Sequence, residues 1–179
     1  MARYFLVGCS KNKSFARGKA ASRVYHGALF WLHKELIKWH QLVAERQNQT
    51  IPGWSIVSAK YGLLQPTDEI EDYNLHIKQM SKELKSKWAR LVVKELFKMT
   101  RGRCKLIVLL MGADYATLLE KELLNVGYTV ERPLKGLGIG QQKQWLHKEI
   151  ARLENLDFDL HKQQMAQLQN DLELREELA

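Results

Sequence analysis

Short runs of apolar residues recur along the chain and predict buried β-strands. Three of them, at residues 3–8 (RYFLVG), 54–59 (WSIVSA) and 105–111 (KLIVLLM), are dominated by apolar residues, several of them β-branched. Runs of this length suit the strands of a parallel sheet that is covered on both faces. A fourth, weaker strand is predicted at residues 128–132.

The segments between these runs repeat apolar residues at helical spacing. They predict helices at residues 28–47, 81–99, 113–126 and 140–154, with Ser81 as the N-cap of the second. Alternating strands and helices predict an α/β fold in three layers. We expect a central, mainly parallel sheet of about four strands flanked by helices, plus a C-terminal helix at residues 158–178.

Charge divides the chain into a basic body and an acidic tail. The whole chain has a net charge of +8, but residues 154–179 contain seven acidic and two basic residues. The remaining 153 residues therefore carry a net charge of +13. A body this basic indicates a polyanionic partner, although basic charge also serves solubility alone. We expect a nucleic-acid-acting domain at residues 1–156 and an acidic helical tail at 157–179, which packs back or joins two copies as a homodimer.

The location of the protein is predicted from its cysteines and its N-terminus. The first apolar run is too short for a signal peptide, and no run is long enough to cross a membrane. Two cysteines, Cys9 and Cys104, fit a reducing compartment better than a disulfide framework. We therefore predict a cytoplasmic protein with no membrane partner.

Polar side chains follow the first strand directly. Ser10, Lys11, Asn12 and Lys13 offer a hydroxyl, an amide and two ammonium groups near the carboxyl end of that strand. In a doubly wound sheet this is the edge where ligands bind. These groups suit a phosphate, and a solvated turn is the alternative interpretation.

The loop after the second strand has the highest density of functional groups. Acidic residues crowd into residues 68–72, beside Lys60, Tyr61 and Tyr73. A carboxylate in a basic cleft can act as a general base or stabilise a cation, and the tyrosines can stack on a base drawn out of DNA. An acidic surface loop without catalysis is the alternative.

The last loop and the histidines give weaker signals. Residues 136–140 (GLGIG) precede a helix, so their amides can form an anion-binding nest, or only a tight turn. The loop matches neither a dinucleotide nor a nucleotide-triphosphate motif. His26, His33 and His40 are seven residues apart, too far for one metal ion, so we interpret them as packing residues. We expect neither a metal nor an organic cofactor.

Several sequence blocks together resemble a family of small bacterial and phage domains. The blocks are residues 6–13 (LVGCSKNK), 25–27 (YHG), 58–64 (SAKYGLL), 66–73 (PTDEIEDY) and 133–140, and the resemblance covers roughly residues 4–147. The second loop is also similar to that of the YaaA peroxide-stress proteins, which bind DNA. The family distantly resembles the uracil-DNA glycosylase superfamily, which includes anti-phage glycosylases of bulky modified bases. The chain lacks the Gly-x-Asp-Pro-Tyr and His-Pro-Ser motifs of true uracil-DNA glycosylases.

The resemblance implies a DNA glycosylase that excises a modified base, in antiviral defence. It implies Asp68 as the catalytic carboxylate, supported by Lys60 and Tyr73. The expected substrate and DNA contacts are Ser10, Lys11, Asn12, Lys13, Ser58, Tyr61, Gly138 and Gln141. Two other interpretations remain open: a non-catalytic DNA-binding protein of the YaaA type, and an enzyme that acts on a free nucleotide or nucleoside.

Overall fold

Five strands form the central sheet in the computed structural model, which describes residues 3–177. They are β1 (Arg3–Gly8), β2 (Gly53–Ser58), β3 (Gly62–Leu64), β4 (Leu106–Leu110) and β5 (Thr129–Glu131), in the order β3-β2-β1-β4-β5. β1 pairs in parallel with β2 and with β4, and β4 pairs in parallel with β5. The predicted α/β fold with a mainly parallel sheet is confirmed, with one strand more than expected.

The additional strand is β3, an antiparallel partner of β2 at one edge of the sheet. Residues 62–64 were expected to be loop, and that expectation is wrong. Gly62 has φ = +70°, a conformation that favours glycine and lets the chain reverse directly after β2. Leu63 and Leu64 then pair with Val57 and Ile56. The resulting hairpin places residues 59–61 at the carboxyl end of β2.

The helices follow the apolar periodicity closely. They are α1 (Ala21–Val24), α2 (Ala28–Arg46), α3 (Lys82–Thr100), α4 (Ala113–Asn125) and α5 (Ile139–Glu177), with a short 3₁₀ helix, η1, at Ile77–Gln79. Ser81 is confirmed as the N-cap of α3, because its Oγ accepts a hydrogen bond from the Leu84 amide at 3.2 Å. Within residues 3–177, no helix combines the length and apolar character that a membrane span requires.

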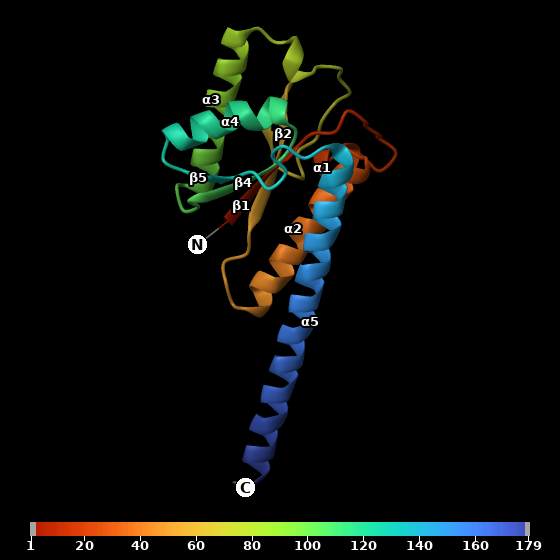
Figure 1. Ribbon diagram of the computed structural model, residues 1–179, viewed down its shortest axis with the longest axis vertical. Coiled ribbons are helices and arrows are strands. Elements are labelled where there is room, and N and C mark those ends of the chain that lie inside the picture. Colours follow the sequence, from red (N-terminus) through yellow and green to blue (C-terminus); the bar gives the residue numbers. More distant parts are fainter. Residues whose placement is uncertain (1–2, 178–179) are drawn as a thin grey trace.

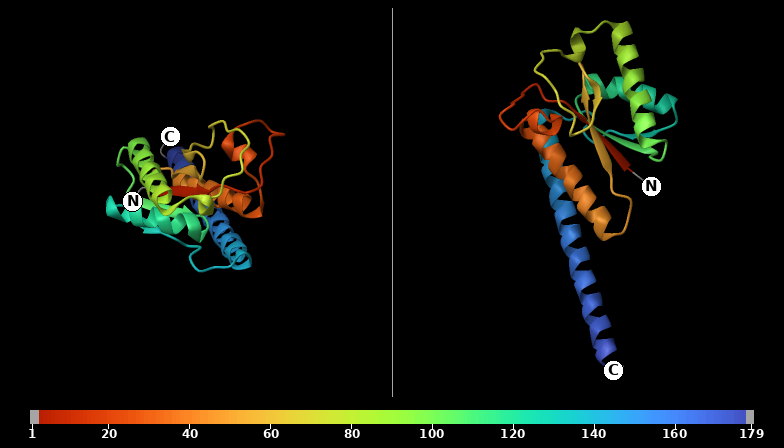
Figure 2. Two further views of the ribbon diagram at one scale, coloured as in Figure 1. Left: turned by 90° about the horizontal axis from the view of Figure 1, so that it is seen from above. Right: turned by 180° about the vertical axis from the view of Figure 1, so that it is seen from behind.

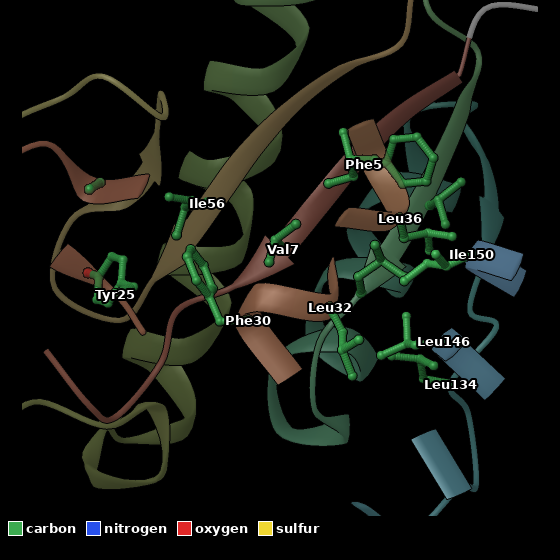
Figure 3. Packing of buried hydrophobic residues seen from close by; sticks show 14 of the residues in the cluster. Phe5, Val7, Tyr25, Phe30, Leu32, Leu36, Ile56, Leu134, Leu146 and Ile150 are labelled. Carbon is green, nitrogen blue, oxygen red and sulfur yellow. The ribbon is translucent and has the colours of Figure 1, made fainter. Parts of the chain in front are cut away.

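The sheet separates two helical layers, as Figure 1 shows, with α2 and α5 on one face and α3 and α4 on the other. Alternate residues of β1 face the two layers: Phe5 and Val7 pack with α2 and α5, whereas Leu6 packs with α3 and α4. Figure 3 shows the first of these cores, in which Leu36 of α2 and Ile150 of α5 lie close to Phe5. Both faces of β1 are therefore buried, as its continuous apolar run predicted.

The C-terminal region is one continuous helix rather than two. α5 runs from Ile139 to Glu177, so the separate helices expected at residues 140–154 and 158–178 are joined. Its first half packs along α2 (Figures 1 and 2), and an ion pair links Arg46 to Asp157. The expected domain boundary after residue 156 thus lies inside this helix. Beyond it Leu160 still packs against the core, whereas Met165, Leu168 and Leu172 are exposed. The homodimer stays a prediction.

Candidate functional site

The carboxyl ends of β1 and β4 lie side by side at the topological switch point of the sheet, where the strand order reverses. From β1 the chain passes to β2 on one side, whereas β4 continues to β5 on the other. The loops after these two strands therefore diverge and leave a crevice, which is the usual ligand-binding position in open α/β sheets. Residues 9–13 and 111–112 follow these strands and lie at this crevice.

Three hydroxyl groups form a hydrogen-bonded network beside the crevice, which we call the tyrosine network. The Tyr73 hydroxyl lies 2.6 Å from the Tyr25 hydroxyl and 2.7 Å from Ser58 Oγ. Ser58 Oγ also accepts hydrogen bonds from the amides of Lys60 and Tyr61, at 3.2 and 3.3 Å. The network thus ties the loop that carries Tyr73 to the end of β2.

Burial keeps the phenols of the site protonated. It raises the pKa of Tyr25 to about 12 and also raises the pKa of Tyr73 and Tyr115. Because the ordinary pKa of tyrosine is about 10, all three remain neutral at physiological pH. They can donate and accept hydrogen bonds or stack on a planar ligand, but they supply no negative charge.

Two lysines lie against the tyrosine rings. Lys13 Nζ donates to the Tyr73 carbonyl at 2.8 Å and lies 4.2 Å from the centre of the Tyr73 ring. Lys60 Nζ lies 4.9 Å from the Tyr61 ring and 5.4 Å from the Tyr73 ring. These are cation–π distances, and they bring positive charge to the aromatic groups that the sequence singled out.

Two cavities open at this edge of the sheet and share Cys9 and Ser10. The first, the tyrosine cavity, has a volume of about 370 Å³. Its lining consists of Cys9, Ser10, Lys11, Lys13, Tyr73, Asn74, Leu75, His76, Gln79 and Tyr115. Both cations and aromatic side chains therefore face the same space, and its lining contains no carboxylate.

The second cavity, which we call the switch cavity, lies directly between the ends of β1 and β4. Its volume is about 430 Å³. It is lined by residues 8–10 at the end of β1, residues 27–30 at the start of α2 with His33, residues 110–112 at the end of β4, and Ile139, Gln142 and Lys143 of α5. Apolar side chains and the N-termini of helices therefore surround the switch cavity.

Ser10 shapes the loop between the two cavities. Its Oγ donates to the His26 carbonyl and accepts a hydrogen bond from the Asn12 amide at 3.2 Å. A Cβ at Gly27, whose φ is +132°, would come within 3.4 Å of this oxygen. Ser10 therefore positions the loop, while Lys11 and Lys13 of the same loop line the tyrosine cavity.

The structure places Asp68 away from both cavities. Its carboxylate accepts a hydrogen bond from the Gln65 amide at 2.7 Å, and its carbonyl accepts one from the Ala21 amide at 2.8 Å. Asp68 is exposed and stabilises a turn. Neighbouring Glu71 pairs with Lys19 at 2.6 Å. The structure therefore does not bring Asp68 together with Lys13 and Tyr73.

A different carboxylate, Asp72, faces the lysines. An open groove of about 520 Å³, which we call the rim groove, adjoins the tyrosine cavity. It is lined by Lys11, Asn12, Lys13, His26, Asp72, Tyr73 and Asn74. Asp72 Oδ1 also accepts the Tyr73 amide at 2.9 Å, which holds its carboxylate next to the aromatic ring.

A hydrogen bond joins Gly138 and Gln141 at the start of α5. The Gly138 amide donates to Gln141 Oε1 at 2.9 Å, and its carbonyl accepts the Gln142 amide at 2.9 Å. Neither residue lines the switch cavity; their neighbours Gln142 and Lys143 do. The glycine-rich loop thus begins the helix, and the residues after it face the cavity.

Several residues of the site are absent from the sequence-based set, among them Tyr25, Asp72, Tyr115, His33 and Lys143. Tyr25 and Asp72 belong to blocks of the family resemblance, which is a signal that could have pointed to them. The Tyr115 hydroxyl oxygen lies 3.9 Å from Cys9 Sγ, although the two residues are 106 positions apart in the sequence. His33 was expected to be a packing residue, and it lines the switch cavity.

The fold and the site define an α/β protein with a doubly wound sheet and two adjoining cavities at its switch point. The chain belongs to a family of unknown function, DUF6884, whose model matches residues 4–148. The match includes the sheet except for Arg3, the first residue of β1, and every residue that lines the two cavities, and it ends within α5. No curated protein matches the chain.

Proposed function

We propose that this protein is a DNA glycosylase, acting in the cytoplasm, that turns a modified base out of DNA and hydrolyses its N-glycosidic bond. The observation that carries the proposal is the tyrosine cavity: a space of about 370 Å³ lined by Tyr73 and Tyr115, with Lys11 and Lys13 at its side. Its size is within the range of about 300 to 1,000 Å³ for small-molecule sites.

The energetics of base flipping agree with this lining. Extruding a base costs a few kcal/mol, and stacking on an aromatic side chain returns about 1 to 3 kcal/mol per base. Lysines at the rim bind the flanking phosphates and offset the remainder. The resemblance to the uracil-DNA glycosylase superfamily points to the same activity.

In this mechanism a water oxygen bonds to C1′ of the sugar as the bond from C1′ to the base nitrogen breaks. The base leaves with the bonding electrons and takes up a proton. We assign to Asp72 the stabilisation of the cationic sugar, since it is the carboxylate that faces Lys11 and Lys13 in the rim groove. Lys60 and Tyr61 support the Tyr73 ring from outside the cavity.

The direct test is the formation of abasic sites in duplex DNA, read by strand cleavage in alkali. The substrates are DNA with normal bases, uracil, hydroxymethylcytosine and glucosylated hydroxymethylcytosine. We expect cleavage confined to one modified base, because a cavity of limited volume with a fixed lining selects its occupant. Absence of cleavage on every substrate would contradict a glycosylase.

A second candidate function is non-catalytic DNA binding of the YaaA type. The observation that favours it is the lining of the tyrosine cavity, which has cations and aromatic groups but no carboxylate. Tight, salt-sensitive binding without base release on any substrate is the outcome that this candidate predicts.

Lys11→Ala is expected to weaken DNA binding about threefold to tenfold and to reduce the slope of log K against log salt by about one. Lys11 is exposed and lines both the tyrosine cavity and the rim groove, so one phosphate contact is lost. Fluorescence anisotropy over a salt series measures both quantities. Lys87→Ala, which removes an exposed charge from α3, is the control and should leave the slope unchanged. Equal effects of the two variants would mean that only net charge matters.

A further inference from the structure

The switch cavity lies at the starts of three helices. It is lined by Gly27, the N-cap of α2, with the three residues that follow; by Gly112, the N-cap of α4; and by Ile139, the first residue of α5. Among the residues that the structure describes, no side chain caps α2 or α4. Amides of a first helical turn have no acceptor within the helix, and the helix dipole adds partial positive charge at this end.

The charged side chain at the cavity has the same sign. Lys143 of α5 lines it, and none of its other lining residues is acidic. Gly27 has φ = +132°, a conformation that glycine adopts without strain. Ala28, Leu29 and Phe30, the first three residues of α2, line the cavity, so an anion in it lies beside the first turn of this helix.

His33 gives independent evidence for a ligand. It lines the cavity, yet its side chain is only 5% exposed. Within residues 3–177, neither of its ring nitrogens has a hydrogen-bond partner. Buried polar groups are nearly always hydrogen-bonded, because an unsatisfied group is costly. A polar ligand in the switch cavity would supply the missing partner.

We propose that the switch cavity binds the phosphate group of a nucleotide. The open amides of α2 and α4 and Lys143 Nζ hold the phosphate oxygens, and His33 completes the set of hydrogen bonds. The two cavities share Cys9 and Ser10, so one nucleotide can place its phosphate here and its base in the tyrosine cavity. The inference takes from the proposed function only the choice of a nucleotide as the ligand.

The test is isothermal titration calorimetry of the full chain with four probes: inorganic phosphate, thymidine 5′-monophosphate, thymidine and a short single-stranded oligonucleotide. Two variants remove cavity groups, Lys143→Ala and His33→Leu. The matched control is Lys148→Ala, which removes the same charge from an exposed position on the same helix, outside the cavity. The oligonucleotide distinguishes a backbone phosphate of DNA from a free nucleotide.

We expect the monophosphate to bind at least about tenfold more tightly than thymidine, the effect of one charge-assisted contact. Lys143→Ala and His33→Leu should each weaken binding about tenfold, whereas Lys148→Ala should change it by less than about twofold. If these losses occur for the oligonucleotide alone, the phosphate belongs to DNA.

Equal affinity for thymidine and its monophosphate would overturn the inference, as would affinities that neither cavity variant changes, or no binding of any probe. Base release is measured separately. A chain that binds nucleotide phosphate at this cavity and releases no base would contradict the glycosylase and leave the phosphate site standing.

Discussion

Asp72→Asn is expected to slow base release from DNA by at least about a hundredfold, the usual contribution of one positioned acid–base group. The amide keeps the size of the side chain but removes the charge that stabilises a cationic sugar. DNA affinity should not fall, because one negative charge fewer faces the phosphates. Single-turnover cleavage assays and fluorescence anisotropy measure the two quantities.

Asp68→Asn is the matched control, since it makes the same charge change four residues earlier in the same loop. The asparagine oxygen can still accept the Gln65 amide that the Asp68 carboxylate accepts at 2.7 Å, so the turn is retained. We expect base release to change by less than about fivefold, an effect well below that of a catalytic group. Loss of activity in Asp68→Asn with activity kept in Asp72→Asn would restore Asp68 as the catalytic carboxylate and remove Asp72.

His33→Leu is expected to raise the free energy of unfolding by about 1 to 3 kcal/mol at neutral pH, the cost of an unsatisfied buried polar group. Phe30, Leu110 and Met111 line the same cavity, so a leucine has apolar neighbours there. Urea denaturation of the ligand-free chains measures the difference. A decrease in stability would mean that the imidazole makes a favourable contact in the free protein.

The gain in stability from His33→Leu should increase as the pH falls. Burial lowers the pKa of His33 from its ordinary value of 6.5 to about 4. Between pH 6.5 and 4 the unfolded chain therefore binds a proton that the folded chain does not, and the native protein loses about 3 kcal/mol across this window. The variant lacks this loss.

His40 has the same lowered pKa, about 4, and stays in both proteins. Its contribution cancels in the comparison, so the difference between the two curves isolates His33. Curves of unfolding free energy that run parallel from pH 7 to pH 4 would contradict the burial of a neutral imidazole in the folded state.

The sheet and its helical layers could be predicted because each long element carries its own pattern. β1 and β4 are continuous apolar runs, and Ser81 marks the start of α3. β3 could not be predicted, since three residues after a glycine show no period and form a strand only by pairing with β2. The joining of α5 into one helix was also missed, because the apolar spacing changes where α5 extends past α2.

The candidate site could be predicted only in part. Strand ends pointed to Lys13, Ser58 and Tyr73, and the structure brings these three together. Asp68 and Asp72 are equivalent in the sequence, and only the turn at residues 65–68 turns one of them away. His33 gave no signal, because its missing partners are a property of tertiary packing.

The length of α5 separates the positive and negative charge of the molecule over a long distance. The 39 residues of this helix extend about 58 Å, from the cavities at its start to a distal half within the acidic segment. The protein is thus a long electric dipole, with its positive pole in the basic α/β body that contains the cavities. Near DNA, such a dipole experiences a torque that turns the cavity end toward the duplex before contact. If DNA is the partner, as proposed, we expect this orientation to increase productive encounters at low salt and to weaken as the Debye length shortens.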